Sequence, residues 1–187
     1  MKKISFLLFA LCTSVVAFAQ TYNVDKAHSK VGFTVTHLGF NEVDGSFKKF
    51  DAKVTSSKAD FSDAVFEFSA DVKSVSTDND MRDGHLQKPD MFDAEKFATL
   101  TFKSTGISKV TDNTFKLTGD LTMKGVTKSV TLDMKVTGTT TDRSGKKVAG
   151  FKVTGTVNRA DFGVGGKGSM MISEAVELRA VGEFKAG

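Results

Sequence analysis

Apolar and polar residues alternate along several long stretches of this chain. From Val31 to Val35, for example, every second residue is apolar and the residues between are glycine and threonine. Successive side chains of a β-strand point to opposite faces, so a period of two predicts strands with one buried and one wet face. The same alternation covers residues 64–72, 115–123, 130–136, 151–157 and 176–184.

Two further apolar runs, at residues 43–55 and 98–105, bring the expected number of strands to about eight. Turn-forming segments separate the strands at residues 111–113, 124–125 and 142–145. The sequence therefore predicts an all-β fold, an eight-stranded antiparallel barrel. A barrel of about eight strands has room for its own side chains or for one small ligand.

Three glycines, Gly119, Gly155 and Gly182, lie inside expected strands and on the apolar face. A glycine at such a position marks a sharp bend or a close approach of another group. We expect these three glycines to assist the closure of the barrel.

The alternation stops between Thr77 and Phe97. Asp78 is a candidate helix cap, and residues 80–86 are expected to form a short helix before Pro89 ends it. A second helical turn is expected at residues 90–97. We predict that this short helical insert, residues 78–97, closes one end of the barrel, with Met81, Leu86, Met91 and Phe92 seated against the interior.

The first residues have the pattern of a secretory signal. Two lysines precede an apolar run, and Ala17 and Ala19 supply the small residues that a signal peptidase recognises. We predict a cleaved signal peptide at residues 1–19 and a single domain at 20–187, without a transmembrane segment, in a periplasmic or secreted protein. The alternative is an uncleaved N-terminal anchor.

Signal cleavage changes both charge and cysteine content. It removes two lysines and lowers the formal charge from +4 to +2, and the remaining lysines are scattered, which argues against a nucleic-acid partner. It also removes Cys12, the only cysteine, so the mature chain cannot form an internal disulfide and its core must supply the stability.

Strand phase predicts which side chains line the barrel interior. These inward faces consist of Phe, Val, Leu and Met, and they suit an apolar guest. Each buried methylene contributes roughly 0.8 kcal/mol, so one five-carbon isoprenyl unit gives about 3–4 kcal/mol before ordering costs. The expected lining is Phe33, Val35, Phe66, Phe68, Phe102, Phe115, Leu117, Leu132, Met134, Phe151, Val153 and Leu178, and the ligand-binding set also includes Phe40 and Phe92.

A guest with a polar head needs a polar partner at the end of the barrel. His37, Arg82 and His85 are the candidates, and a spacing of three places Arg82 and His85 on one helical face. The alternative for Arg82 is a structural ion pair with Asp80, Asp90 or Asp93. Arg159, two residues before Asp161, is expected to stabilise a turn.

The chain offers little to a metal or to catalysis. The three histidines, His28, His37 and His85, are far apart in sequence and have no cysteine beside them, so no metal site is expected. No strained nucleophile turn and no glycine-rich phosphate loop are present. We therefore expect no catalytic residues and no required cofactor.

Several segments, in order, are similar to one known family. Together they cover nearly all of the mature chain, and five patterns in series are more specific than any one of them. The chain resembles the YceI-like, polyisoprenoid-binding family, although Ala98 and Met91 stand where that family usually has a proline and an aromatic residue. The matching segments are 29–40 with Val43, Gly45 and Phe47; 80–93; 97–105; 119–128; and 158–163.

The resemblance implies a lipocalin-like, eight-stranded antiparallel barrel in the periplasm or outside the cell. It also implies a bound isoprenoid or other long-chain lipid in the interior, and no catalysis. The leading hypothesis is thus an exported carrier of a polyisoprenoid or isoprenoid quinone.

Two other classes stay open. One is a barrel enzyme that acts on an apolar substrate with His37 or His85 as acid or base. The other is a structural or stress-response protein whose interior is filled by its own side chains. A homodimer is a further expectation from the family, and Val65 and Val181, apolar residues on otherwise polar faces, are candidates for its contact.

Overall fold

The computed structural model describes residues 19–187, so all but the last residue of the expected signal peptide lies outside the described part of the chain. Within this part, no helix is both long and apolar enough to cross a bilayer. The elements are β1 (Gln20–His37), β2 (Asn41–Phe47), β3 (Phe50–Ser56), β4 (Val65–Asp71), the 3-10 helix η1 (Val72–Ser74), β5 (Val75–Ser76), α1 (Asp80–Leu86), β6 (Thr99–Lys109), β7 (Thr114–Met123), β8 (Val126–Thr141), β9 (Lys147–Asn158), the 3-10 helix η2 (Arg159–Phe162) and β10 (Ile172–Ala186).

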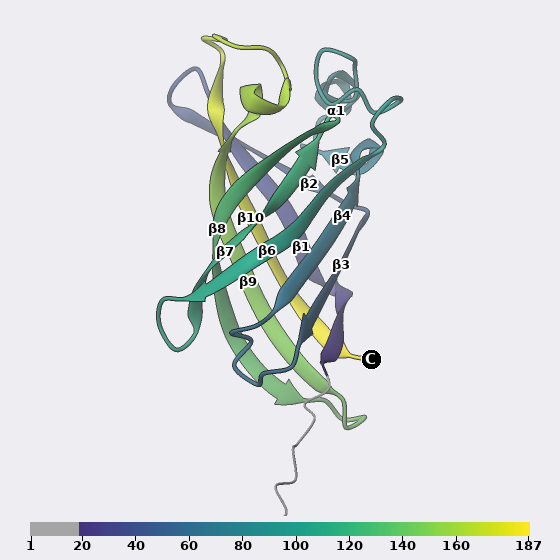
Figure 1. Cartoon of the computed structure of the whole chain (residues 1–187). Helices are drawn as coiled ribbons and strands as arrows, with labels where there is room; N and C mark the ends of the chain where they lie inside the picture. The colour runs from purple at the N-terminus through teal and green to yellow at the C-terminus, as the bar shows by residue number, and fades with distance from the viewer. Residues whose placement is uncertain (1–18) are drawn as a thin grey trace, which may run out of the picture.

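Eight strands close an antiparallel barrel, which confirms the predicted fold (Figure 1). The first strand, β1, pairs with β10 on one side and, through its first residues, with β3 on the other. From β10 the ladder runs through β9, β8, β7, β6 and β4 back to β3. The ring is closed between β1 and β3 by a short ladder, in which Gln20–Asn23 pair with Lys53–Ser56.

The run at residues 43–55, expected as one strand, divides into β2 and β3. The backbone N–H groups of Lys48 and Lys49 donate to the carbonyl oxygen and the hydroxyl of Ser74, at 3.0 and 2.9 Å. These bonds turn the chain away from β1 at this point. As a result, β2 pairs with the last residues of β1 and with the two-residue β5, and these two strands extend the barrel at one end.

The glycines of the inner face permit close approaches, as the sequence predicts. A Cβ atom added at Gly119 would lie 2.5 Å from the carbonyl oxygen of Lys103 and 2.5 Å from Cζ of Phe102. At Gly155 it would lie 2.5 Å from Cδ2 of Leu132. Both contacts are between neighbouring strands. The glycines therefore leave space on the inner face for Phe102 and Leu132 of the adjacent strands.

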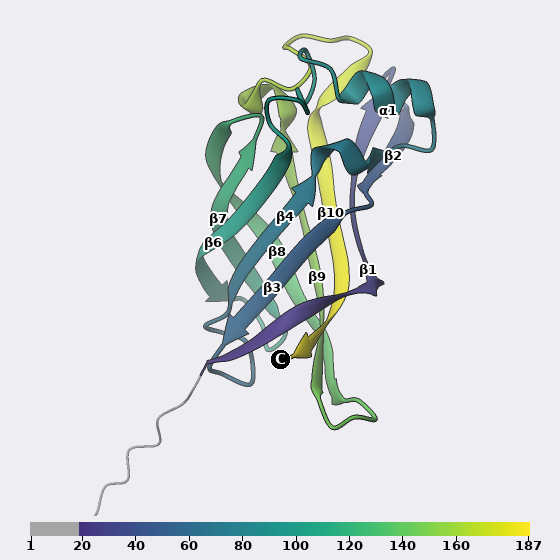
Figure 2. The ribbon, with the colours of Figure 1, turned by 90° about the vertical axis from the view of Figure 1, so that its right-hand side faces the viewer.

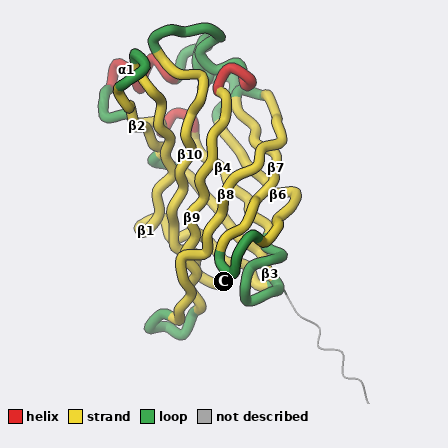
Figure 3. The backbone as a smooth tube through the Cα atoms, turned by 90° about the vertical axis from the view of Figure 1, so that its left-hand side faces the viewer, coloured by secondary structure: helices red, strands yellow, loops and turns green. Residues whose placement is uncertain are grey.

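The two ends of the barrel differ. The turns at residues 110–113 and 142–146 and the C-terminus lie at one end, and α1 lies at the other (Figures 1 and 2). The segment 159–171 and the turn at residues 38–40 also lie at the end with α1, where the colours of Figure 1 identify them, and Figure 3 shows several loops gathered at this end. We call this second end the mouth.

The insert contains one short helix, α1. Its N-cap is Asn79, whose side chain accepts a hydrogen bond from the N–H of Arg82 at 3.0 Å, so the expected cap at Asp78 is wrong by one residue. Asp78 instead has a left-handed backbone (φ 59°), which brings the chain into the helix. Residues 90–97 form successive turns rather than the second helical segment that the sequence suggested.

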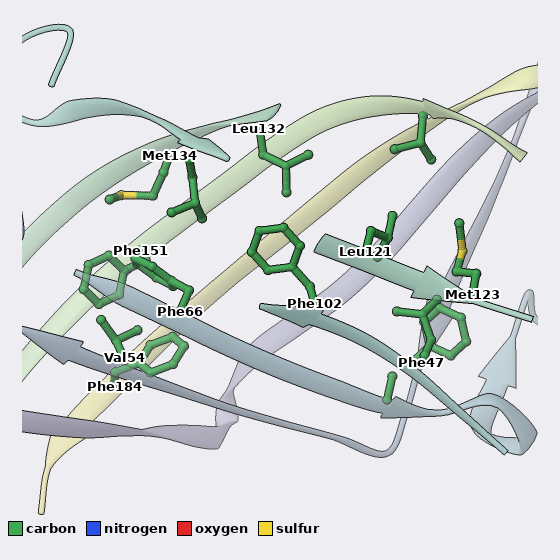
Figure 4. Packing of buried hydrophobic residues seen from close by; sticks show 14 of the residues in the cluster. Phe47, Val54, Phe66, Phe102, Leu121, Met123, Leu132, Met134, Phe151 and Phe184 are labelled. Carbon is green, nitrogen blue, oxygen red and sulfur yellow. The ribbon is translucent and has the colours of Figure 1, made fainter. Parts of the chain in front are cut away.

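Aromatic side chains fill the end opposite the mouth. Phe61, in the loop between β3 and β4, is 2% exposed, and its ring packs edge-on against Tyr22 and Phe151 with centroids 5.4 and 5.0 Å away. Phe151 also contacts Phe66 and Phe184 edge-on (Figure 4). Such aromatic pairs add about 0.5–1.5 kcal/mol each beyond area burial. This end of the barrel is therefore a packed core.

Candidate ligand-binding cavity

A cavity of about 670 Å³ occupies the barrel interior between the packed end and the mouth. Aliphatic and aromatic side chains from all eight strands of the ring line it, and it reaches the surface at the mouth beside the exposed residues Arg82 and His85. The volume falls within the roughly 300–1,000 Å³ of typical small-molecule sites. An apolar wall with a few polar groups at one end suits an amphiphile.

Strand phase places most of the predicted lining residues in this cavity. Fourteen of the seventeen predicted residues line it, and they come from seven strands of the ring and from the insert. The residues are Phe33, Val35, His37, Phe66, Phe68, Arg82, His85, Phe92, Phe102, Leu117, Leu132, Phe151, Val153 and Leu178.

Phe115 and Met134 point inward as predicted but do not line the cavity. Each is 1% exposed and belongs to the packed core. Phe115 is at the start of β7 and Met134 is its cross-strand partner on β8, so both lie near the end opposite the mouth. Strand phase identifies the inner face but does not give the depth at which packing ends and the cavity begins.

Phe40 is the clearest correction. It is 81% exposed and lies outside the cavity. Leu38 and Gly39 have left-handed backbones (φ 53° and 79°) and reverse the chain between β1 and β2. Because Phe40 follows this tight turn, the alternation of β1 does not extend to it, and its ring points away from the barrel.

Arg82 is held by Thr77 at the rim of the cavity. Its Nε donates to Thr77 Oγ1 and its Nη2 donates to the Thr77 carbonyl oxygen, both at 2.7 Å. The Thr77 hydroxyl in turn donates to Asp83 at 2.5 Å. The ion pairs of the described chain do not include Arg82, so the structural alternative that the sequence left open takes the form of bonds to Thr77, not a pair with Asp80, Asp90 or Asp93.

His85 and His37 complete the polar groups considered for the mouth. His85 Nε2 lies 3.2 Å from Asp90 Oδ2, and this hydrogen bond lowers the pKa of Asp90. His37 is the last residue of β1, where it pairs with Asn41 of β2 and Ile172 of β10. Three polar side chains thus line the cavity at the mouth. His37 comes from the wall, and Arg82 and His85 come from the insert.

The third histidine, His28, lies elsewhere. It shares a cluster on the barrel surface with Asp25 and Glu183, and its Nδ1 is 3.0 Å from Asp25. Lys185 Nζ lies 2.7 Å from the same carboxylate. The bonds from Lys185 and His28 hold the pKa of Asp25 well below its usual range, and Asp25 raises the pKa of His28. Lys185 is therefore a cation already paired with the Asp25 carboxylate of this cluster.

Arg159 stabilises the segment 159–171, as the sequence suggested, but not through Asp161. Its side chain is 6% exposed and donates four hydrogen bonds to backbone carbonyl oxygens. The acceptors belong to Val164, Gly166, Ile172 and Ser173, at 2.8–3.1 Å. A buried guanidinium surrounded by carbonyls fixes this segment at the mouth.

Several cavity residues were not in the predicted set. Leu121 and Met123 share the inner face of β7 with Leu117, so their strand phase was a sufficient signal. Phe47 also lines the cavity, and its ring lies 6.0 Å from that of Phe92, which joins the insert to the wall. That contact between distant segments had no signal in the sequence.

A family model described as a YceI-like domain matches residues 22–184. This chain belongs to the YceI-like family. Among curated YceI-like relatives, a UPF0312 protein of Staphylococcus aureus is 36% identical over 169 residues, which is 87% of this chain and 96% of the relative.

Solved structures agree with the family assignment. BcnA of Burkholderia cenocepacia superposes with a TM-score of 0.78 at 26% identity, over 86% of this chain and 98% of that one. A YceI protein of Campylobacter jejuni gives 0.71 at 31% identity, over 88% and 96%. A polyisoprenoid binding domain from Saccharophagus degradans gives 0.61 at 16% identity, over 89% and 98%, and this likeness concerns the fold alone.

Proposed function

We propose that this protein is an exported carrier that holds one long apolar amphiphile, a polyisoprenoid or an isoprenoid quinone, in the barrel cavity. The observation that carries the proposal is the cavity of about 670 Å³, which is lined mostly by apolar side chains and has Arg82 and His85 among its polar lining residues. The description of the Saccharophagus degradans domain as polyisoprenoid binding is in keeping with such a guest in this fold.

The expected affinity follows from the wall. Each five-carbon unit that leaves water gives about 3–4 kcal/mol before ordering costs, so a few units outweigh the roughly 4–15 kcal/mol lost on association. Few polar contacts are then required. We expect the tail to lie along Phe102, Leu121 and Leu132, at the centre of the wall shown in Figure 4.

The polar head belongs at the mouth. Thr77 holds the Arg82 guanidinium at the cavity rim through Nε and Nη2, and His85 lies one turn further along α1. A carbonyl, hydroxyl or phosphate oxygen of the guest would accept hydrogen bonds from these donors. The open end, rather than the packed end, is thus the place for oxygen atoms.

Binding is favoured over catalysis because the two histidines of the enzymatic alternative lack a nucleophile. In the described chain, neither His37 nor His85 has a hydrogen bond to a serine or threonine hydroxyl, and His85 pairs with Asp90. The site therefore offers an apolar wall and hydrogen-bond donors, which are sufficient to hold a guest.

Native mass spectrometry tests the proposal. The full chain is expressed in a bacterium, recovered from periplasmic and cytoplasmic fractions, and measured before and after organic extraction. We expect mature protein without residues 1–19 in the periplasmic fraction, with an extractable apolar adduct. Protein that stays in the cytoplasm would contradict export, and protein without adduct that also fails to take up added ubiquinone would contradict the carrier function.

A further inference from the structure

Large apolar side chains gather on the outside of the mouth. Among the described residues, the three most exposed of these are Met170 (94%), Met81 (85%) and Phe40 (81%), and Leu38 and Met171 are also exposed. The expectation that Met81 is seated against the interior is therefore wrong, whereas Leu86, Met91 and Phe92 line the cavity. In the described part of the chain, the other exposed large apolar residues are Val65 at the start of β4, Val110 in the turn between β6 and β7, and Val181 within β10. Single exposed apolar residues are ordinary, but a concentration at one end marks an interaction surface.

Backbone hydrogen bonds join the segments that carry these side chains, and residues next to them in sequence line the cavity. The N–H of Leu38 donates to the carbonyl oxygen of Met171 at 2.8 Å, which ties the turn at 38–40 to the segment 159–171. The N–H of Gly165 donates to the carbonyl oxygen of Asp90 at 2.9 Å, which ties this segment to the insert. The three segments lie together at the end with α1 (Figure 2). We call the side chains of Leu38, Phe40, Met81, Met170 and Met171 the apolar rim.

The turn that precedes Phe40 contains a strained residue, Leu38. A tight turn with two left-handed residues favours Asn-Gly, because a branched side chain is strained there. This chain has Leu38 at the first of these positions (φ 53°). The folding of the turn itself therefore does not explain a leucine at position 38.

From this arrangement we infer that the apolar rim inserts into the surface of a lipid bilayer, so that the cavity opens directly onto the membrane. The inference rests on the proposed function, because an isoprenoid guest resides in bilayers and must leave or enter the protein through the mouth that the rim surrounds. Phenylalanine and flexible methionine side chains on separate loops suit the irregular boundary between headgroups and acyl chains.

The charge of the insert beside the apolar rim indicates which lipid headgroups the protein can approach. Residues 77–97 contain six acidic and three basic residues, so the insert beside the rim is negatively charged. An acidic surface repels anionic headgroups within a Debye length of about 8 Å at physiological salt. Apolar insertion, not charge attraction, is the driving force, and we expect zwitterionic lipid to suffice.

Vesicle flotation tests the inference with the full mature chain. We expect the protein to float with phosphatidylcholine vesicles, and the double variant Phe40→Ser/Met170→Ser to partition roughly a hundredfold less, as the loss of two buried apolar side chains implies. Val110→Ser removes a side chain that is 60% exposed in the turn between β6 and β7, and should float like the unchanged protein.

Three results would overturn the inference. The unchanged protein could stay out of the vesicle fraction, Val110→Ser could reduce flotation as much as the double variant, or flotation could require phosphatidylglycerol and vanish in high salt. A fourth result would also overturn the inference. Light scattering could show that the unchanged protein is a dimer, that the double variant is a monomer, and that neither floats; the apolar rim would then be a contact with a second copy of the chain.

Guest content, measured on the same preparations, separates this inference from the proposed function. Protein that contains guest but does not float contradicts the docking alone. Protein that floats but neither contains nor takes up an apolar guest contradicts the carrier function. A melting curve for each variant verifies that the fold is unchanged.

Discussion

Phe61 packs edge-on against Phe151 at a centroid distance of 5.0 Å with the ring planes at 88°, and this contact lies at the end of the barrel opposite the mouth. Phe61 comes from a loop and Phe151 from β9. The loop residue thereby covers the packed end, and the cavity has its opening at the mouth. This aromatic pair thus marks the packed end of the barrel, opposite the mouth.

Replacing Phe61 by alanine should destabilise the protein by about 3–5 kcal/mol, because the loss of a ring that is 2% exposed leaves a cavity beside Tyr22 and Phe151. Denaturant unfolding of Phe61→Ala measures the loss. Val110→Ala, in an exposed turn at the same end, is the control and should change stability by less than about 0.5 kcal/mol. Equal effects of the two changes would contradict the role of Phe61.

Arg82→Ala should weaken guest retention by roughly 1.5–3 kcal/mol, the worth of a hydrogen bond to a charged group. His85→Ala should weaken it less, because Asp90 already engages that imidazole. Guest content after purification, with a melting curve, is the measurement. Lys88→Ala, an exposed lysine of the same insert, should retain its guest. Undiminished guest in both variants would remove the head-group role but not the apolar cavity.

Gly119→Ala should destabilise the barrel by about 1–3 kcal/mol, because the new methyl group meets the backbone oxygen of Lys103 and cannot be accommodated by a side-chain movement alone. Gly106, on the neighbouring strand β6, has open space where its Cβ would lie. Gly106→Ala is therefore a matched control, and we expect it to be neutral or slightly stabilising. Thermal melting of both variants compares them, and a larger loss for Gly106→Ala would show that the close approach is misassigned.

Asp63 should govern part of the acid stability. Burial alone would raise the pKa of Asp63, but hydrogen bonds from the hydroxyls of Ser56 and Ser57 and from the N–H groups of Ser57 and Lys58 outweigh it and lower the pKa to about 2. A carboxyl group whose pKa is lower in the folded chain stabilises the fold above its ordinary pKa of 3.8, and this contribution is lost as the pH falls toward 2.

Urea unfolding between pH 5 and pH 2 measures this dependence. Asp63→Asn should be less stable than the unchanged protein at neutral pH and should lose less stability on acidification. Asp112→Asn, at a fully exposed position in a neighbouring turn, should follow the unchanged protein. If the free energy of unfolding fell equally between pH 5 and pH 2 for the unchanged protein and Asp63→Asn, Asp63 would not govern the acid stability.

The sequence is sufficient for the wall of the barrel and insufficient for its ends. Along the strands, a period of two identifies inward residues such as Phe102 and Leu132, because side-chain direction follows directly from backbone geometry. It does not tell Leu117, which lines the cavity, from Phe115, which is buried in the core two residues earlier. That difference depends on how far the aromatic side chains of the packed end extend along the barrel toward the mouth.

The ends depend on turns and on contacts between distant segments. Phe40 leaves the barrel because two left-handed residues precede it, and Phe61 enters the core although its loop has no periodic pattern. The bonds from Arg82 to Thr77 and from Arg159 to four carbonyls involve backbone oxygens, which every residue carries and no composition reveals. Turn chemistry and backbone acceptors thus account for most of what sequence reasoning missed at the mouth.

A variant that fills the cavity would test whether the cavity holds an apolar guest. Ala180 of β10 lines the cavity, and Ala175 of the same strand is exposed. Native mass spectrometry, after incubation of each protein with ubiquinone, should show one bound molecule on the unchanged protein and on Ala175→Phe, and strongly reduced binding on Ala180→Phe. Equal binding by all three proteins, or binding by none, would contradict the account.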